Sequence, residues 1–201
     1  MKKLIIITLL SLPVLAIAGP VLSANLLTNG GFETDAQAAG GYSIKSNLTG
    51  WTGGTYGIEL RDAMSGTAYD GKNFIELDTT ANSSISQSFT TIVGQTYQLS
   101  FAYAARPDNL GAASDGMSWS AGNMNDVAFG QNTNANWTMA DASFVATSTT
   151  TTLSFKAIGT SDSYGTSLDD VSVRAIPEPP SYALLLAGLA ACGMVARRRN
   201  R

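Results

Sequence analysis

The run Ser83-Ser84-Ile85-Ser86-Gln87-Ser88-Phe89 is followed, after Thr90 to Gly94, by Gln95-Thr96-Tyr97-Gln98-Leu99-Ser100-Phe101-Ala102-Tyr103. Apolar and small polar side chains alternate along both runs, which is the period of a β-strand with one buried face. A Val93-Gly94 turn separates them. We therefore expect two strands joined as a β-hairpin.

Further alternating runs lie on either side, at residues 73–78, 137–146, 152–157 and 167–174, and no long helical period occurs. Several short strands separated by Gly, Asn and Asp turns are typical of an all-β sandwich. The alternation changes phase within 137–146, which predicts a β-bulge near Asp141. In the final run Asp169 shares parity with Val171 and Val173, so we expect its carboxylate to point inward.

Both ends of the chain have the composition of processing segments. Met1-Lys2-Lys3 precedes an apolar run from Leu4 to Leu15, and small residues at 16–18 or 22–24 offer cleavage sites. This pattern predicts a helical secretory signal peptide over residues 1–24. The β-sandwich domain is then expected over residues 25–176.

Residues 177–201 combine a Pro-rich entry, an apolar run over 182–196 and the tail Arg197-Arg198-Arg199-Asn200-Arg201. The run is shorter than the ~20 residues of a typical membrane-spanning helix. Flanking arginines stay on the cytoplasmic side. We expect a short transmembrane helix; a buried core helix would fit the arginines poorly.

This order of parts resembles the PEP-CTERM sorting signal. The resemblance implies export through the inner membrane and cleavage by an exosortase near Pro177, Glu178 and Pro179. Contact with the membrane would be transient, through the C-terminal segment. The mature protein would reach the cell surface or the extracellular matrix.

Charge and composition exclude several functions for residues 25–176. Six basic residues against fourteen acidic ones give a net charge of about −8, which disfavours nucleic acid and would repel an acidic polysaccharide unless a divalent cation bridged the two. The chain has no histidine, and its one cysteine, Cys192, lies in the tail. Ser-His-Asp and Cys-His catalysis and histidine-ligated zinc are therefore excluded.

Acidic residues near the two ends of this window suggest a metal site. Domain termini commonly lie close together, so Glu33 and Asp169 are expected to meet. An inward carboxylate needs a partner, and calcium takes carboxylate and carbonyl oxygens. Alternatively, Asp169 accepts hydrogen bonds from turn amides and Glu33 is solvated.

The window as a whole resembles galactose-binding-like jelly rolls, including DUF642-type secreted domains and carbohydrate-binding modules. The resemblance spans nearly all of 25–174. It rests on Asn-Gly-Gly-Phe-Glu at 29–33, Gly-Trp at 50–51, the runs at 71–78, 85–89 and 94–101, and Leu-Asp-Asp-Val-Ser-Val at 168–173. It implies a sandwich of eight to ten strands, a structural calcium held by Asn29, Glu33 and Asp169, and glycan binding in many members.

A sugar site needs an aromatic platform with nearby polar groups. Our candidate is Trp119 with Arg106, Asp108, Asn109 and Asn123, from a Gly-rich stretch at 106–124. Such a stretch is either a functional loop or a loop broken by a short strand at 117–120. Trp51, with Tyr42 and Tyr56, is a second candidate, but Trp51 and Trp137 fit better as core residues.

The resulting hypothesis is an exported protein that binds or scaffolds exopolysaccharide in the biofilm matrix. The alternative is a structural or adhesive matrix protein that binds no glycan. A glycan-active enzyme would need an acid/base pair from Glu59, Asp62, Glu76 and Asp78. Because Glu76 and Asp78 alternate with apolar residues and are expected on a solvated face, we predict no enzyme activity.

Overall fold

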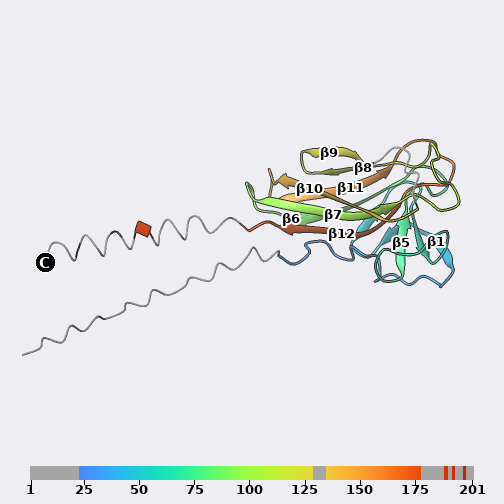
Figure 1. The fold of residues 1–201 in the computed structure, drawn as a ribbon, viewed down its shortest axis with the longest axis horizontal. Helices are drawn as coiled ribbons and strands as arrows, with labels where there is room; N and C mark the ends of the chain where they lie inside the picture. The colour runs from blue at the N-terminus through green and yellow to red at the C-terminus, as the bar shows by residue number, and fades with distance from the viewer. Residues whose placement is uncertain (1–22, 129–134, 178–187, 190–191, 193–196, 198–201) are drawn as a thin grey trace, which may run out of the picture.

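The alternating runs form the strands of two antiparallel sheets, packed face to face, in the computed structural model (Figure 1). The structure describes residues 23–128 and 135–177, together with Gly188, Leu189, Cys192 and Arg197. The all-β jelly-roll prediction is confirmed for this part of the chain. The predicted signal-peptide helix lies outside the described residues. So does nearly all of the predicted C-terminal helix, although its four described residues, Gly188, Leu189, Cys192 and Arg197, are helical.

Each sheet has six strands, and neighbours in the following orders are hydrogen-bonded. The first sheet runs β1 (Gly41–Lys45), β4 (Ile58–Asp62), β5 (Asn73–Glu76), β12 (Ser167–Ala175), β7 (Thr96–Ala104) and β10 (Thr138–Val145). The second runs β2 (Asn47–Leu48), β3 (Trp51–Gly53), β6 (Ser84–Thr90), β11 (Thr150–Ala157), β8 (Met117–Ala121) and β9 (Met124–Ala128). Within the described residues, no helix is long and apolar enough to cross a membrane.

The strands β6 and β7 form where the sequence predicts them, but the expected hairpin between them is wrong. They belong to different sheets, and the segment between them crosses the sandwich beside the β10–β11 connection. The Thr91 N–H donates to Thr149 O, and the Gly94 N–H donates to Ala146 O. Alternation shows that each strand has one apolar face, but it does not say whether two such faces lie side by side or opposite each other.

The core lies between the sheets and is centred on Phe101 of β7. Its ring centroid is 5.0 Å from that of Phe155 on β11 and 6.4 Å from that of Trp119 on β8, so the two sheets interlock through aromatic side chains. Trp51 is buried against Phe32, as predicted for a core residue.

The bulge occurs in β12 and not in β10. Strand β10 pairs with β7 in continuous register, whereas β12 shifts register against β7 between Asp169 and Ser172. Asp170 has a φ of 45° at this point. Because the extra residue resets the alternation, Leu168 and Val171 both enter the core and Asp169 points to the outer face of the first sheet. The inward orientation predicted for Asp169 is therefore wrong.

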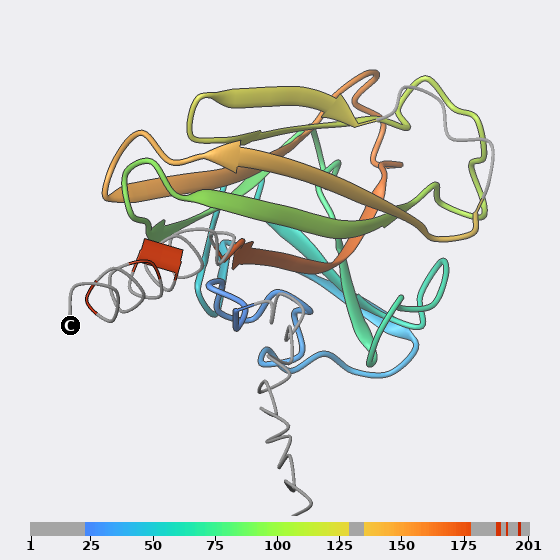
Figure 2. The same cartoon turned by 60° about the vertical axis from the view of Figure 1, so that its left-hand side comes forward.

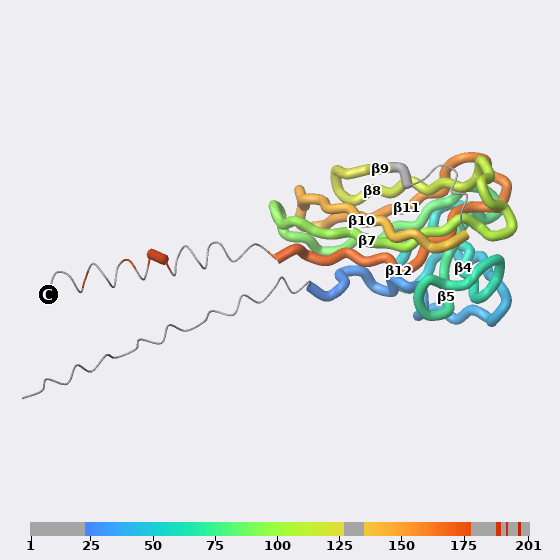
Figure 3. Tube along the Cα trace, in the orientation of Figure 1, coloured from blue at the N-terminus to red at the C-terminus, as the bar shows by residue number. Residues whose placement is uncertain are grey.

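The first described residues run beside the end of β12, so the two ends of the domain are neighbours (Figures 1, 2 and 3). The Leu26 N–H donates to Val173 O at 2.8 Å, and Ser23 Oγ accepts from the Ala175 N–H at 2.7 Å. Both ends therefore leave the sandwich at the same pole.

Candidate functional site

A buried charged cluster lies on the outer face of the first sheet, at β4 and β5. Ile58 and Leu60 enter the core, so the intervening Glu59 and Arg61 point outward, and Glu76 stands opposite Glu59 in the ladder. Arg61 and Glu76 are nevertheless 0% exposed because loops cover this face. Asp78 is also buried. The solvated face predicted for Glu76 and Asp78 is therefore wrong.

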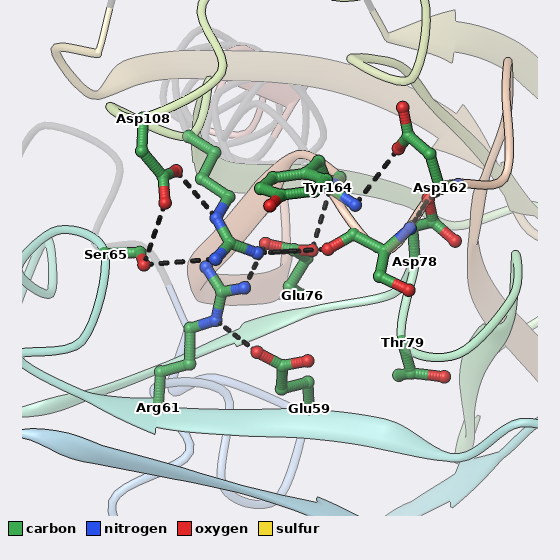
Figure 4. Close-up of polar contacts among 12 residues, drawn as sticks. Glu59, Arg61, Ser65, Glu76, Asp78, Thr79, Asp108, Asp162 and Tyr164 are labelled. Atoms are coloured by element: carbon green, nitrogen blue, oxygen red, sulfur yellow. Dashed lines mark hydrogen bonds and ion pairs between the residues drawn. The ribbon is translucent and has the colours of Figure 1, made fainter.

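Two arginines and two glutamates lie close together in this cluster (Figure 4). Arg61 Nε lies 2.7 Å from Glu59 Oε1, and Arg61 Nη2 lies 2.6 Å from Glu76 Oε2. Arg106 Nη1 is 3.6 Å from Glu76 Oε1, which also accepts the Gly165 N–H at 2.8 Å. Arg61 is fully buried, whereas the side chain of Arg106 is 12% exposed.

Burial raises the pKa of Glu76 to about 8. The charges of Arg61 and Arg106 and the Gly165 N–H act in the opposite direction, while Glu59 adds to the rise. Loss of hydration thus outweighs the two arginines. Glu76 is accordingly protonated at neutral pH.

Arg106 holds three loops together over this cluster. Its Nε donates to Asp108 Oδ1 at 2.7 Å, its Nη1 to Ser163 O at 3.1 Å, and its Nη2 to Ser65 Oγ at 3.1 Å. Its guanidinium also lies over the Tyr164 ring, 4.6 Å from the centroid. Burial alone would raise the pKa of Asp108, but the hydrogen bond and the charge of Arg106 lower it.

Asp78 shapes the loop that carries Tyr164. Its Oδ2 accepts the N–H groups of Asp162 and Ser163 at 2.9 and 3.0 Å. Asp162 Oδ1 in turn accepts the Tyr164 N–H at 3.2 Å. A buried carboxylate thus fixes the backbone that presents the Tyr164 ring to solvent (Figure 4).

These loops enclose a hollow of about 330 Å³, which we name the tyrosine pocket. Tyr42 and Tyr164 are 53% and 40% exposed, so both rings offer surface to a ligand. The polar groups of the lining are a carboxylate, a guanidinium and several hydroxyls, a combination that suits a sugar ring. The lining comprises Tyr42, Ile44, Glu59, Met64, Thr79, Thr80, Arg106, Ser163 and Tyr164.

A second hollow of about 240 Å³ adjoins Ser65 and Pro107 and is lined by Trp137 and Phe74. Trp137 packs edge-on against Phe74, with ring centroids 6.0 Å apart, and its Nε1 donates to Thr67 O at 2.9 Å. It is half-buried on the outer face, so the prediction that it belongs to the core is wrong.

The predicted sugar-site residues divide between the two sheets. Arg106 and Asp108 bond to each other beside the tyrosine pocket, and the Asn109 N–H donates to Arg106 O in the same turn. Trp119 lies on β8, in the second sheet, and Asn123 in the turn after it.

Trp119 is only 7% exposed because its ring faces Phe101 in the core, so it is not the exposed platform that we expected. Trp119 nevertheless lines a hollow of about 500 Å³, together with its neighbours Ser118 and Ser120 and with Ser154 and Lys156. The stretch at 106–124 contains β8, which agrees with a loop broken by a short strand. The sequence does not predict that Tyr164 lines a pocket, because this residue lies in a loop, where no alternating pattern marks it.

Glu33 and Asp169 hold the same loop, as expected if the two ends of the domain meet. Glu33 Oε1 accepts the N–H groups of Lys72 and Asn73 at 2.8 and 2.7 Å. Asp169 Oδ2 accepts those of Tyr69 and Asp70 at 2.8 and 3.1 Å. Asp169 therefore accepts hydrogen bonds from the amides of a turn, which is the alternative to metal binding that the sequence left open.

The fit to calcium differs among the three predicted ligands. Burial raises the pKa of Asp169 to about 7, against the N–H groups of Asp70, Asp170 and Tyr69. The amide of Asn29 is used elsewhere, since its Nδ2 donates to Asp35 Oδ2 and its Oδ1 accepts the Thr34 N–H. The described residues contain no group of three metal-ligating side chains, so calcium would need Glu33, Asp169 and backbone carbonyls.

Residues 25–174 match the family model described as "Protein of unknown function (DUF642)". The chain belongs to the DUF642 family. In this DUF642 protein, residues 175–199 match the PEP-CTERM protein-sorting motif, which indicates export and exosortase-mediated placement at the surface or outside the cell. No curated protein matches the chain.

Solved structures similar to this DUF642 protein include carbohydrate-binding modules. TmCBM61, in complex with β-1,4-galactotriose, has a TM-score of 0.54 at 16% identity, covering 75% of this chain and 98% of its own. A family 16 carbohydrate-binding module has a TM-score of 0.49 at 14% identity, covering 74% and 99%. The CBM22-1 xylan-binding domain of Paenibacillus barcinonensis Xyn10C has 0.46 at 16%, covering 72% and 100%. The similarity to TmCBM61 shows that the two chains share a fold.

Proposed function

We propose that this exported protein binds exopolysaccharide of the extracellular matrix through the tyrosine pocket and carries out no catalysis. The observation that carries the proposal is the pairing of two exposed tyrosine rings, Tyr42 and Tyr164, with the polar groups of Glu59 and Arg106 in one hollow. Aromatic faces stack on the C–H surface of sugar rings, and the polar groups orient hydroxyls.

The polar groups of the pocket are held rigidly, which favours binding. Arg106 is fixed by hydrogen bonds to Asp108, Ser163 and Ser65, and Tyr164 is held between that guanidinium and the loop shaped by Asp78. A rigid site loses little conformational entropy when it binds. Glycoside hydrolysis would need two carboxyl groups that flank the substrate. Glu59 and Glu76 instead pair with the same Arg61, which supports binding without hydrolysis.

The position of the pocket supports binding while the protein is still attached by its sorting segment. Strand β12 begins beside Gly165 and Glu76 and ends at Ala175, just before the sorting motif. Its nine residues span roughly 25–30 Å. Strand β1, which carries the lining residues Tyr42 and Ile44, lies toward the pole opposite the one where both ends leave the domain (Figure 1).

Affinity electrophoresis of the exported protein through gels containing polysaccharide, including that of the native host, tests the proposal. Tyr164→Ala and Tyr42→Ala should each weaken retardation at least several-fold. Tyr56→Ala is the matched control, because its exposed ring lies outside the pocket lining. Absence of retardation by every polysaccharide would instead favour an adhesive matrix protein that binds no glycan.

We also propose that calcium braces Glu33 and Asp169 at the joined ends of the domain. Both carboxylates hold loop 69–73 and retain lone pairs beyond the amide bonds they accept. Calcium would add a cation beside a buried carboxylate. A chelator should therefore lower the melting temperature of the wild type and have less effect on Asp169→Asn; an unchanged wild-type melting curve would contradict the proposal.

A further inference from the structure

We infer that the tyrosine pocket selects glycans with free amino groups, such as polymers of glucosamine, over glycans of uronic acids. The inference rests on the proposed function and names the ligand class of the same site. It follows from the sign of the charges that a ligand meets there.

Carboxylates outnumber guanidinium groups around the pocket, and they differ in exposure. Arg61 is 0% exposed, and the side chain of Arg106 is 12% exposed. Both are already paired with carboxylates. The side chain of Asp108 is 49% exposed, and Asp162, which precedes the pocket residues Ser163 and Tyr164, is also exposed. The exposed carboxylates adjoin lining residues without belonging to the lining, and the Arg106 guanidinium of the lining is already paired with Asp108. The unpaired charge that a ligand meets around the pocket is therefore negative.

The rings favour the same ligand class. The Arg106 guanidinium lies 4.6 Å from the centroid of Tyr164, so this ring already contacts one cation through a face. The Tyr42 ring is more than half exposed. An ammonium group close to a tyrosine face gains a cation–π attraction.

An acidic glycan meets repulsion at two levels. At the rim, its carboxylates approach Asp108 and Asp162. At longer range they approach a domain with six basic and fourteen acidic residues over 25–176. Like charges brought together suppress wrong partners, so the same residues that attract an amine exclude a uronate.

Three oligosaccharide probes of equal length test the inference on the exported protein: β-1,4-linked glucosamine, β-1,4-linked N-acetylglucosamine and galacturonate. Calorimetry at low salt should give the tightest binding to glucosamine, about 5- to 20-fold tighter than to N-acetylglucosamine. Galacturonate should bind most weakly. The preference for glucosamine should shrink at 0.5 M salt, where the electrostatic screening length is about 3–4 Å, because the charges lie at the surface.

Asp162→Asn isolates the electrostatic part, because asparagine keeps the oxygen that accepts the Tyr164 N–H. We expect a 3- to 10-fold loss of affinity for glucosamine and no change for N-acetylglucosamine. Asp141→Asn, an exposed change on β10, should alter neither.

The inference would be overturned by galacturonate binding tighter than glucosamine, or by Asp162→Asn weakening the binding of the neutral and the amino probe equally. Binding of all three probes without preference would also overturn it, yet leave the proposed function standing if Tyr164→Ala abolishes binding. Failure of every probe and polysaccharide to bind would overturn both.

Discussion

Glu76→Gln tests the physical account of the buried cluster. Glutamine keeps the shape of a protonated glutamic acid, but its one oxygen can either accept the Gly165 N–H or face Arg61 Nη2, so the change carries a cost that does not depend on pH. In the wild type, burial raises the pKa of Glu76 from an ordinary value of 4.5 to about 8. The folded domain therefore holds a proton that the unfolded chain releases near pH 4.5.

The sign of the pH effect follows from this difference. Between about pH 4.5 and 8 the folded state binds one more proton than the unfolded state, so stability falls as pH rises. The slope is about 1.4 kcal/mol per pH unit for one proton, which amounts to a loss on the order of 5 kcal/mol across the window. Glu76→Gln removes this contribution. We expect the difference in stability between the variant and the wild type to shift by several kcal/mol in favour of the variant between pH 5 and pH 9.

Urea denaturation followed by tryptophan fluorescence, at pH 5, 7 and 9, measures the difference between the two proteins. Taking differences cancels the contributions of Asp115 and Asp169, whose pKa values are also raised by burial. Asp141→Asn serves as the exposed control. If Glu76→Gln instead loses about 3–5 kcal/mol at pH 7 and 9, the ion pair with Arg61 outweighs burial, and the reasoning is refuted.

Three further changes test the packing. Asp78→Asn should cost about 1–3 kcal/mol, because one oxygen cannot replace both acceptors for Ser161, Asp162 and Ser163; thermal unfolding at pH 7 measures it. Trp119→Ala should cost about 3–5 kcal/mol in urea titrations, since it opens a core cavity; a loss below 1 kcal/mol would contradict its burial. Gly30→Ala should lower the melting temperature, because a Cβ would lie 2.0 Å from Val171 O, whereas Gly31→Ala, with 4.0 Å to its nearest neighbour, is the tolerated control.

Strands β5, β6, β7, β10, β11 and β12 could be predicted from the alternation of single residues, whereas the short strands β1 to β4 and β9 could not. Tyr97, Leu99 and Phe101 occupy the core as their spacing required, and Trp51 is buried as expected. The sorting segment could be recognised because its three parts follow one another directly in the chain. These features depend on neighbours in sequence, so the sequence contains them.

The candidate site could be predicted only in part. Arg106 and Asp108 were selected as charged residues of a Gly-rich loop, and they do lie beside the pocket. Trp119 was selected from the same loop, but a strand begins at Met117 and turns its ring into the core. Tyr164 comes from a loop far along the chain, and its role depends on contacts with Arg106.

The sequence by itself determined the β-strand pattern, the acidic charge, the absence of histidine and the signals for export. Only the tertiary structure decided that β6 and β7 lie in opposite sheets, that a bulge turns Asp169 to the outer face, and that Glu76 is buried beside two arginines. The physical reason is that alternation assigns each side chain to one of two faces. Whether a face meets another sheet, a covering loop or solvent depends on segments that are distant in the chain.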